Sequence, residues 1–77
     1  MQRHRMLTDD DLNPTDYLVL DVLREGRATP QFVAEEADIS RTYASERIKR
    51  FSEHGHVEKL APGLYELVVD PEETGDV

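Results

Sequence analysis

Apolar residues in the first third of the chain recur at the three- and four-residue spacing of a helix, and polar residues mark both ends of that stretch. Asn13 can cap a helix, and Pro14 behind it suits the first helical position, where a missing N–H group is no loss. Gly26 is the residue type that most often ends a helix. The pattern therefore predicts a first helix from Asn13 to about Glu25.

Two further helices follow in close succession. Thr29 and Pro30 repeat the signal of a cap followed by proline and open the second helix, which Asp38 interrupts. Ser40 caps a third helix that runs to His54. The residues expected to face the core of the protein are Phe32, Val33, Ala37, Ala44, Ile48 and Phe51.

Beyond the third helix the pattern changes to short apolar runs that are typical of strands. The first run covers residues 56–60 and the second covers residues 64–69. Pro62 and Gly63 between them fill the central positions of a type II turn. The two runs are therefore predicted to form a hairpin, and the link at residues 27–28 is short enough to add a bridging strand.

Both ends of the chain lack this periodicity. Residues 1–12 are expected to form a flexible arm, and residues 70–77 a disordered acidic tail with nothing to pack against. One domain remains between residues 13 and 69, as the short length of the chain predicts. Its order of helix, helix, tight turn, helix and hairpin makes the fold class α+β and mainly helical.

The segment from Pro30 to Phe51 has the pattern of a helix-turn-helix. This motif needs a small residue where the helices cross, a turn residue that tolerates left-handed geometry, and an apolar residue after it, and Ala34, Asp38 and Ile39 supply them. The run AEEADISRTYASERIKRF resembles winged helix-turn-helix regulators, and GHVEKL with APGLYELV resembles their wing. The likeness covers about residues 13–69 and looks closest to small repressor-like proteins of haloarchaea and their viruses. It implies three helices with a C-terminal β-hairpin wing.

The resemblance further implies a sequence-specific regulator, expected to be a repressor, whose third helix enters the major groove of double-stranded DNA while the wing lies near the minor groove. A step of about 100° per residue turns one face of that helix outward. Arg41 is expected to grip a guanine edge and Glu46 to accept from cytosine. Lys49 and Arg50 are expected to bind phosphate. The full set expected at the DNA is Thr29, Gln31, Ser40, Arg41, Thr42, Tyr43, Ser45, Glu46, Lys49, Arg50, Lys59 and Gly63.

Some residues of this surface have a second interpretation. Tyr43 can reach the DNA backbone or pack against the wing, and packing is favoured. Arg47 is expected to neutralise Glu35 or Glu36 of the second helix instead of contacting DNA. The wing residues serve equally well as ordinary hairpin surface or turn residues.

Charge opposes DNA binding over the whole chain but favours it locally. The chain holds 17 acidic residues against 9 basic ones, a net charge of -8. Between Arg41 and Arg50, however, four basic residues stand against one acidic residue, a local charge of +3. The preference for Arg over Lys and the abundance of Asp resemble proteins from cells that hold molar salt, which predicts an extreme halophile as the source. At about 1 M salt the screening length is only about 3 Å, so long-range repulsion nearly vanishes.

Other classes of function have weaker support. Cysteine is absent, and no glycine-rich phosphate loop or nucleophile beside a base occurs, so neither an enzyme nor a cofactor is expected. His54 and His56 with Glu58 are too few for a convincing metal site and are expected to be a surface pair. A winged helix that binds a protein partner instead of DNA stays open as the alternative, because Glu46 and Glu53 would repel phosphate at ordinary salt.

The first helix carries more apolar residues than one face can bury. Its inward arc is expected to hold Leu18, Val19, Val22 and Leu23. Tyr17 and Leu20 lie outside this arc, which predicts the interface of a homodimer. Two-fold pairing would match an inverted-repeat operator, with recognition helices about 34 Å apart. No apolar run approaches the length of about 20 residues that spans a membrane, so a cytoplasmic protein is expected.

Overall fold

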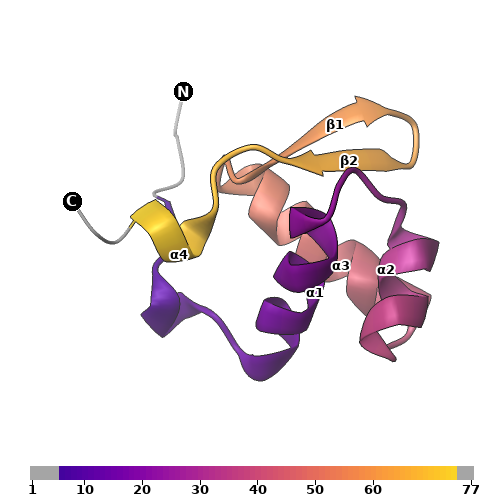
Figure 1. Cartoon of the computed structure of the whole chain (residues 1–77), viewed down its shortest axis with the longest axis horizontal. Helices are drawn as coiled ribbons and strands as arrows, with labels where there is room; N and C mark the ends of the chain where they lie inside the picture. The colour runs from indigo at the N-terminus through magenta and orange to yellow at the C-terminus, as the bar shows by residue number, and fades with distance from the viewer. Residues whose placement is uncertain (1–5, 75–77) are drawn as a thin grey trace.

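A computed structural model describes residues 6–74 of the chain. Figure 1 shows a bundle of helices with a two-stranded hairpin along one side. The elements are η1 (Asp9–Asp11), a 3₁₀ turn, α1 (Pro14–Arg24), α2 (Pro30–Ala37), α3 (Arg41–Glu53), β1 (Val57–Ala61), β2 (Leu64–Leu67) and α4 (Pro71–Thr74). The order confirms the predicted mainly helical fold class with a hairpin after the third helix. No helix in residues 6–74 is long and apolar enough to cross a membrane.

The three main helices begin where their capping residues predict. The side chains of Asn13, Thr29 and Ser40 each accept a hydrogen bond from the backbone N–H three residues later, at 2.8, 3.1 and 3.0 Å. Each bond satisfies one of the N–H groups that a helix start leaves without a partner. Local sequence signals therefore set where these helices begin.

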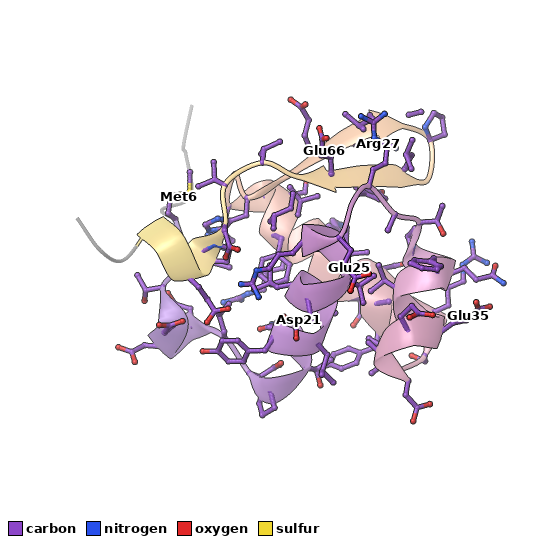
Figure 2. The ribbon with its side chains drawn as sticks, in the orientation of Figure 1. Met6, Asp21, Glu25, Arg27, Glu35 and Glu66 are labelled. Carbon is purple, nitrogen blue, oxygen red and sulfur yellow. The ribbon has the colours of Figure 1, made fainter. Side chains whose placement is uncertain are left out.

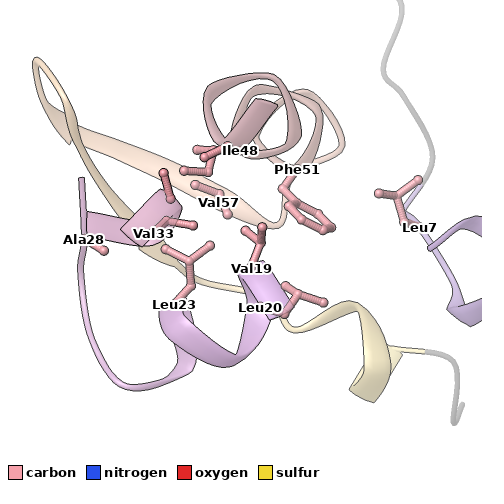
Figure 3. Packing of buried hydrophobic residues seen from close by; sticks show 11 residues of the cluster. Leu7, Val19, Leu20, Leu23, Ala28, Val33, Ile48, Phe51 and Val57 are labelled. Carbon is pink, nitrogen blue, oxygen red and sulfur yellow. The ribbon is translucent and has the colours of Figure 1, made fainter. Parts of the chain in front are cut away.

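The core lies between the three helices and β1, as Figure 3 shows. Its side chains come from α1, α2, α3 and β1, and are Val19, Leu20, Leu23, Val33, Ala34, Ala44, Ile48, Phe51 and Val57, joined by Leu7 and Ala28. Five of the six residues predicted to face the core are buried. Phe32 is the exception, with 48 % of its surface exposed, because α2 turns Val33 inward and leaves its neighbour on the outer side.

The inward face of α1 differs from the prediction. Leu20 is fully buried, whereas Leu18, assigned to the inward arc, is 47 % exposed. The buried residues of α1 follow the line of Asp16, Val19, Leu20 and Leu23, so the helix is rotated relative to the predicted arc. A side chain buried inside one molecule does not reach a second one, and the assignment of Leu20 to a dimer interface is wrong.

The hairpin follows its prediction closely. β1 and β2 pair antiparallel, with Val57 opposite Leu67 and Lys59 opposite Tyr65. Gly63 adopts φ +77° in the turn between them, a conformation that glycine enters without the steric penalty of a side chain. Ala28 exchanges two backbone hydrogen bonds of 2.9 Å with Tyr65, which makes the predicted bridge between the link after α1 and the wing.

The N-terminal segment, residues 6–12, is part of the fold instead of a flexible arm. Leu7 is fully buried, and its N–H donates to His56 Nε2 at 2.8 Å. Thr8 caps η1, and Leu12 packs against the core. The prediction missed this because one apolar residue has no periodicity of its own. The basic start of the predicted arm, residues 3–5, lies outside the described residues.

The C-terminal segment also folds back instead of forming a disordered tail. Pro71 is buried, and Arg24 of α1 binds the Asp70 carboxylate, with 2.9 Å between Nη2 and Oδ1. Arg24 also donates to Glu72 and to Asp21 of its own helix. These contacts hold α4 beside α1 (Figure 1). Residues 75–77 of the predicted tail lie outside the described residues.

Candidate nucleic-acid interface

The turn between α2 and α3 depends on one residue in left-handed geometry. Asp38 has φ 58° and ψ 49°. Directly after it, Ile39 N–H donates to the carbonyl of Ala34 at 3.0 Å, and the same carbonyl accepts the N–H of Asp38, which closes the end of α2. Ala34 is buried, and Ile39 packs against the core. The three residues that indicated a helix-turn-helix therefore take the predicted positions.

The face of α3 opposite its buried stripe is open to a ligand. Ala44, Ile48 and Phe51 point into the core. Arg41, Thr42, Glu46 and Lys49 are exposed, and Ser45 is half-buried. We call Arg41, Thr42, Ser45, Glu46 and Lys49 the reading face. Ser40 precedes them, but its side-chain oxygen is engaged in capping the helix.

Arg47 is not part of the reading face, because it binds Asp16 of α1. Its Nε and Nη2 donate to the two carboxylate oxygens of Asp16 at 2.6 and 2.7 Å, and Asp16 is fully buried. Hydrogen bonds from Arg47 to Asp16 raise the pKa of the guanidinium. The prediction that Arg47 neutralises Glu35 or Glu36 is wrong. Arg47 lies on the side of α3 that faces α1, and this ion pair fixes α3 against α1.

Tyr43 packs against the start of α1. Its hydroxyl accepts a hydrogen bond from Asn13 Nδ2 at 3.2 Å, and the Arg47 guanidinium lies 5.9 Å from the centre of its ring. The side chain is half-buried. Packing was the favoured prediction, but the partner is α1 instead of the wing, and the hydroxyl assigned to DNA is already engaged.

Arg50, predicted to bind phosphate, turns toward the N-terminal segment instead. Its Nη2 lies 3.5 Å from the backbone carbonyl oxygen of Asp11. Its Nε is buried and has no hydrogen-bond partner among the described residues. In this conformation the guanidinium is held beside η1, away from the reading face.

These contacts change the charge that α3 offers to DNA. Two of the four basic residues between positions 41 and 50, Arg47 and Arg50, are turned to other parts of the protein. Arg41 and Lys49 remain exposed against Glu46, so the exposed charge of this stretch is +1 instead of the +3 read from the sequence. The surface is still the place where exposed basic residues gather on the third helix, but its excess of positive charge is small.

The other predicted DNA residues lie on α2 and on the wing. Thr29 caps α2, and Gln31 is exposed with its amide 3.3 Å from Glu35 Oε2. Lys59 is exposed on β1, and Gly63 is exposed at the hairpin tip. Beside the wing, Arg27 Nη2 lies 3.7 Å from Glu66 Oε2 of β2. Figure 2 labels both side chains at the hairpin. Lys59 and Gly63 are thus free to meet a ligand, whereas the side chain of Thr29 has a structural task.

His56 is buried inside the protein and is not part of a surface pair. Its Nε2 accepts from Leu7 N–H at 2.8 Å, and its Nδ1 lies 2.7 Å from the carbonyl oxygen of Val69. The ring also meets Phe51 edge to face, with 6.3 Å between ring centres. Both nitrogens are used by the backbone, and residues 6–74 hold no group of three or more metal-binding side chains. Sequence spacing could not reveal these partners, which are 49 and 13 residues away.

The outer surface of α1 and of the start of α2 exposes apolar side chains at positions other than those predicted. Leu18 is 47 % and Phe32 48 % exposed, and Phe32 lines a shallow pocket with Val22, Glu25 and Arg27. Tyr17 is half-buried, with its hydroxyl 3.4 Å from Asp9. Figure 1 shows α1 in front of α3, and the two helices share the core between them. The outer face of α1 and the outer face of α3 therefore lie on different sides of the core.

Comparison with known proteins agrees with this architecture. A family model described as the MarR family matches residues 10–63, which hold the three helices, β1 and the turn of the wing. No curated protein matches the chain, and no solved structure matches it.

Proposed function

We propose that this chain, which belongs to the MarR family of winged-helix DNA-binding regulators, recognises a specific sequence of double-stranded DNA by placing α3 in the major groove. The observation that carries the proposal is the reading face, which is exposed on the helix after a left-handed turn, where helix-turn-helix proteins contact bases. Family membership supports DNA as the partner. The side chains on the reading face support recognition of its bases by α3.

The roles within the proposed interface follow from side-chain chemistry. Arg41 on the first turn of α3 has the planar fork that binds O6 and N7 of guanine together, and Glu46 can accept from the amino group of cytosine. Lys49 at the far end of the face suits phosphate, which fixes register without reading sequence. Lys59 and the Gly63 tip of the wing are placed by this proposal near the adjacent minor groove. No cofactor takes part.

Substitution of Arg41 tests the proposal. Binding to the DNA upstream of the protein's own gene is measured by fluorescence anisotropy from 0.1 M to molar KCl, against a random duplex. Arg41→Glu should weaken binding to the specific duplex by at least about 100-fold. The matched variant Arg41→Lys keeps the charge and loses the fork, so it should retain binding to both duplexes while discriminating less between them.

The alternative to DNA is a protein partner, and the near-neutral charge of the reading face is the observation that favours it. If wild-type protein binds no duplex at any salt concentration, the DNA proposal fails and the same surface is left for protein contact. If Arg41→Glu binds the specific duplex as tightly as wild type, the reading face is wrongly assigned.

We further propose that the chain acts as a repressor. A domain that occupies its operator blocks a promoter without any second contact, so the DNA-binding fold is sufficient for this role. In a reporter assay, wild-type protein should lower transcription from the upstream region and Arg41→Glu should not. Raised transcription with wild-type protein would show an activator.

A homodimer remains a proposal, now with Leu18, Val22 and Phe32 as its apolar contacts. Because this surface points away from the reading face, a dimer formed there would carry its two α3 helices on opposite sides. A dimer on one inverted repeat needs both α3 helices on the same side. A homodimer that pairs through this surface and a homodimer that binds an inverted-repeat operator therefore require different interfaces. Sedimentation of wild type and Phe32→Glu tests the interface. A wild-type protein that stays monomeric at high micromolar concentration would exclude it.

A further inference from the structure

The N-terminal segment covers a basic residue of the recognition helix. Arg50 lies on α3, yet its Nη2 meets the carbonyl of Asp11 at the long distance of 3.5 Å, and its Nε has no partner among the described residues. A buried guanidinium N–H without an acceptor is unfavourable. Arg50 is therefore held by the segment in a state that leaves part of its hydrogen-bonding capacity unused, and an anionic oxygen would satisfy it better.

One side chain fastens this segment to the rest of the domain. His56 receives the N–H of Leu7 at Nε2, and the side chain of Leu7 is fully buried. On the other side of the ring, Nδ1 lies 2.7 Å from the carbonyl of Val69, so Nδ1 carries the proton and donates. Only a neutral ring can donate at Nδ1 and accept at Nε2. The contact with Leu7 therefore depends on His56 being unprotonated, whereas Nδ1 can donate to Val69 in either protonation state.

We propose that residues 6–12 form a proton-sensitive latch over Arg50, which opens when His56 is protonated and thereby strengthens DNA binding by α3. A proton taken from solvent at Nε2 turns that atom from an acceptor into a donor facing the Leu7 N–H. The backbone bond is lost, Leu7 leaves its site and its N–H turns to water. The carbonyl of Asp11 moves away with the segment, and Arg50 is released to bind phosphate. This proposal rests on the proposed function, because phosphate is the ligand that Arg50 would reach.

The surroundings of His56 allow its protonation to act on the latch. The contact from α3 is the ring of Phe51, and the contact from the N-terminal segment is backbone. The charged group on the side of Val69 is Asp70, whose pKa is lowered by hydrogen bonds from Arg24 of α1. Asp70 is therefore the negative charge on this side of the ring, and the guanidinium of Arg24 partly offsets it.

The latch itself is tested on the protein without DNA. Amide hydrogen exchange by NMR gives the protection factor of Leu7 at pH 8 and at about pH 5.5. We expect protection to fall at least about tenfold at the lower pH, while Ala28, whose N–H donates to Tyr65 in the wing, stays protected. In His56→Gln the side chain does not titrate in this range, so Leu7 protection should not depend on pH, whatever its level. Equal protection of Leu7 in wild type at both pH values would overturn the proposal.

The effect on DNA is measured at the same two pH values and constant salt. Wild type should bind about 5- to 10-fold more tightly at the lower pH, the gain of one phosphate contact. Arg50→Gln should lose this gain in DNA affinity, although its Leu7 protection should still fall with pH. The comparison separates the contribution of Arg50 to the gain from any contribution of the other histidines. An equal gain in wild type and Arg50→Gln overturns the proposal. If no variant binds DNA at either pH, the proposed function fails, and the Leu7 measurement still decides whether the latch exists.

Discussion

At the scale of single residues, Asp16 connects two tasks. Its carboxylate accepts a hydrogen bond from the N–H of Asn13 at 3.0 Å, which completes the cap of α1. The same carboxylate accepts hydrogen bonds from Nε and Nη2 of Arg47. A buried carboxylate is tolerated only when its charge and its lone pairs are matched. The orientation of α3 against α1 is therefore set in part by one buried polar pair.

Asp16→Asn should destabilise the protein by about 3 kcal/mol, because it leaves the Arg47 guanidinium without its anion. The control is Asp21→Asn on the exposed face of the same helix, which should change stability by less than about 1 kcal/mol. Urea denaturation of both variants measures the difference. Similar losses for the two would mean that burial of Asp16 adds nothing.

The left-handed geometry of Asp38 leads to a second prediction. With φ 58°, an L-residue pays a steric penalty that glycine avoids. Asp38→Gly should raise the free energy of unfolding by about 0.5–1 kcal/mol, and Asp38→Val should lower it by about 1–2 kcal/mol. Asp38→Asn, which tolerates the same geometry, should stay close to wild type. A valine variant as stable as wild type would contradict this account of the turn.

At the scale of elements, the short helix α4 is held to α1 by ion pairs of Arg24. Hydrogen bonds from Arg24 lower the pKa of Asp70, and the carboxylates of Asp70 and Glu72 raise the pKa of Arg24. A carboxylate with a lowered pKa stabilises the fold at pH values above its unfolded pKa, and that contribution is lost as the pH falls through the folded value. The docking of α4 is thus sensitive to acid.

Asp70→Asn tests this sensitivity. The loss of stability relative to wild type should be constant above about pH 5 and should shrink as the pH falls below about 3.9, the unfolded value for Asp. Urea midpoints between pH 6 and pH 3 measure it. In an Arg24→Gln background the pH dependence of the difference should become smaller, because the Glu72 backbone N–H is then the hydrogen-bond donor left to Asp70. An unchanged pH dependence there would contradict the role of Arg24.

The elements also show which local signals are reliable. Caps at Asn13, Thr29 and Ser40 marked the helix starts correctly, and Pro62 with Gly63 marked the turn of the wing, because these signals act within a few residues. The ends of the chain were predicted incorrectly because Leu7 and Asp70 are held by distant residues. A short segment without periodicity has no signal for a partner that lies far away along the chain.

At the scale of the whole molecule, charge is distributed unevenly. The total is -8, and the exposed basic residues assigned to DNA are Arg41, Lys49 and Lys59. The slope of log K against log [salt] is proportional to the number of phosphates that basic residues neutralise. Three basic residues at the DNA therefore allow only a small salt dependence of binding. Arg47 and Arg50 do not contribute while their side chains stay turned away.

The slope of log K against log [KCl] at pH 8 should therefore be no steeper than about -3. Lys49→Gln should reduce its magnitude by about 1, whereas Asp21→Asn on the outer face of α1 should leave it unchanged. Anisotropy titrations at four or more salt concentrations measure it. A slope of about -5 or steeper would show that basic residues beyond Arg41, Lys49 and Lys59 also bind phosphate.

The sequence alone determined the order of elements from α1 to β2, the helix starts, the left-handed turn at Asp38 and the buried stripe of α3, because each depends on residues a few positions apart. Tertiary structure alone decided which cations remain for DNA. Arg47, Tyr43 and Arg50 point to α1 or η1, and His56 joins two ends of the chain, through contacts that no local pattern encodes. A helical wheel shows which way a side chain points, but long-range packing decides whether that side chain binds a buried residue of another element.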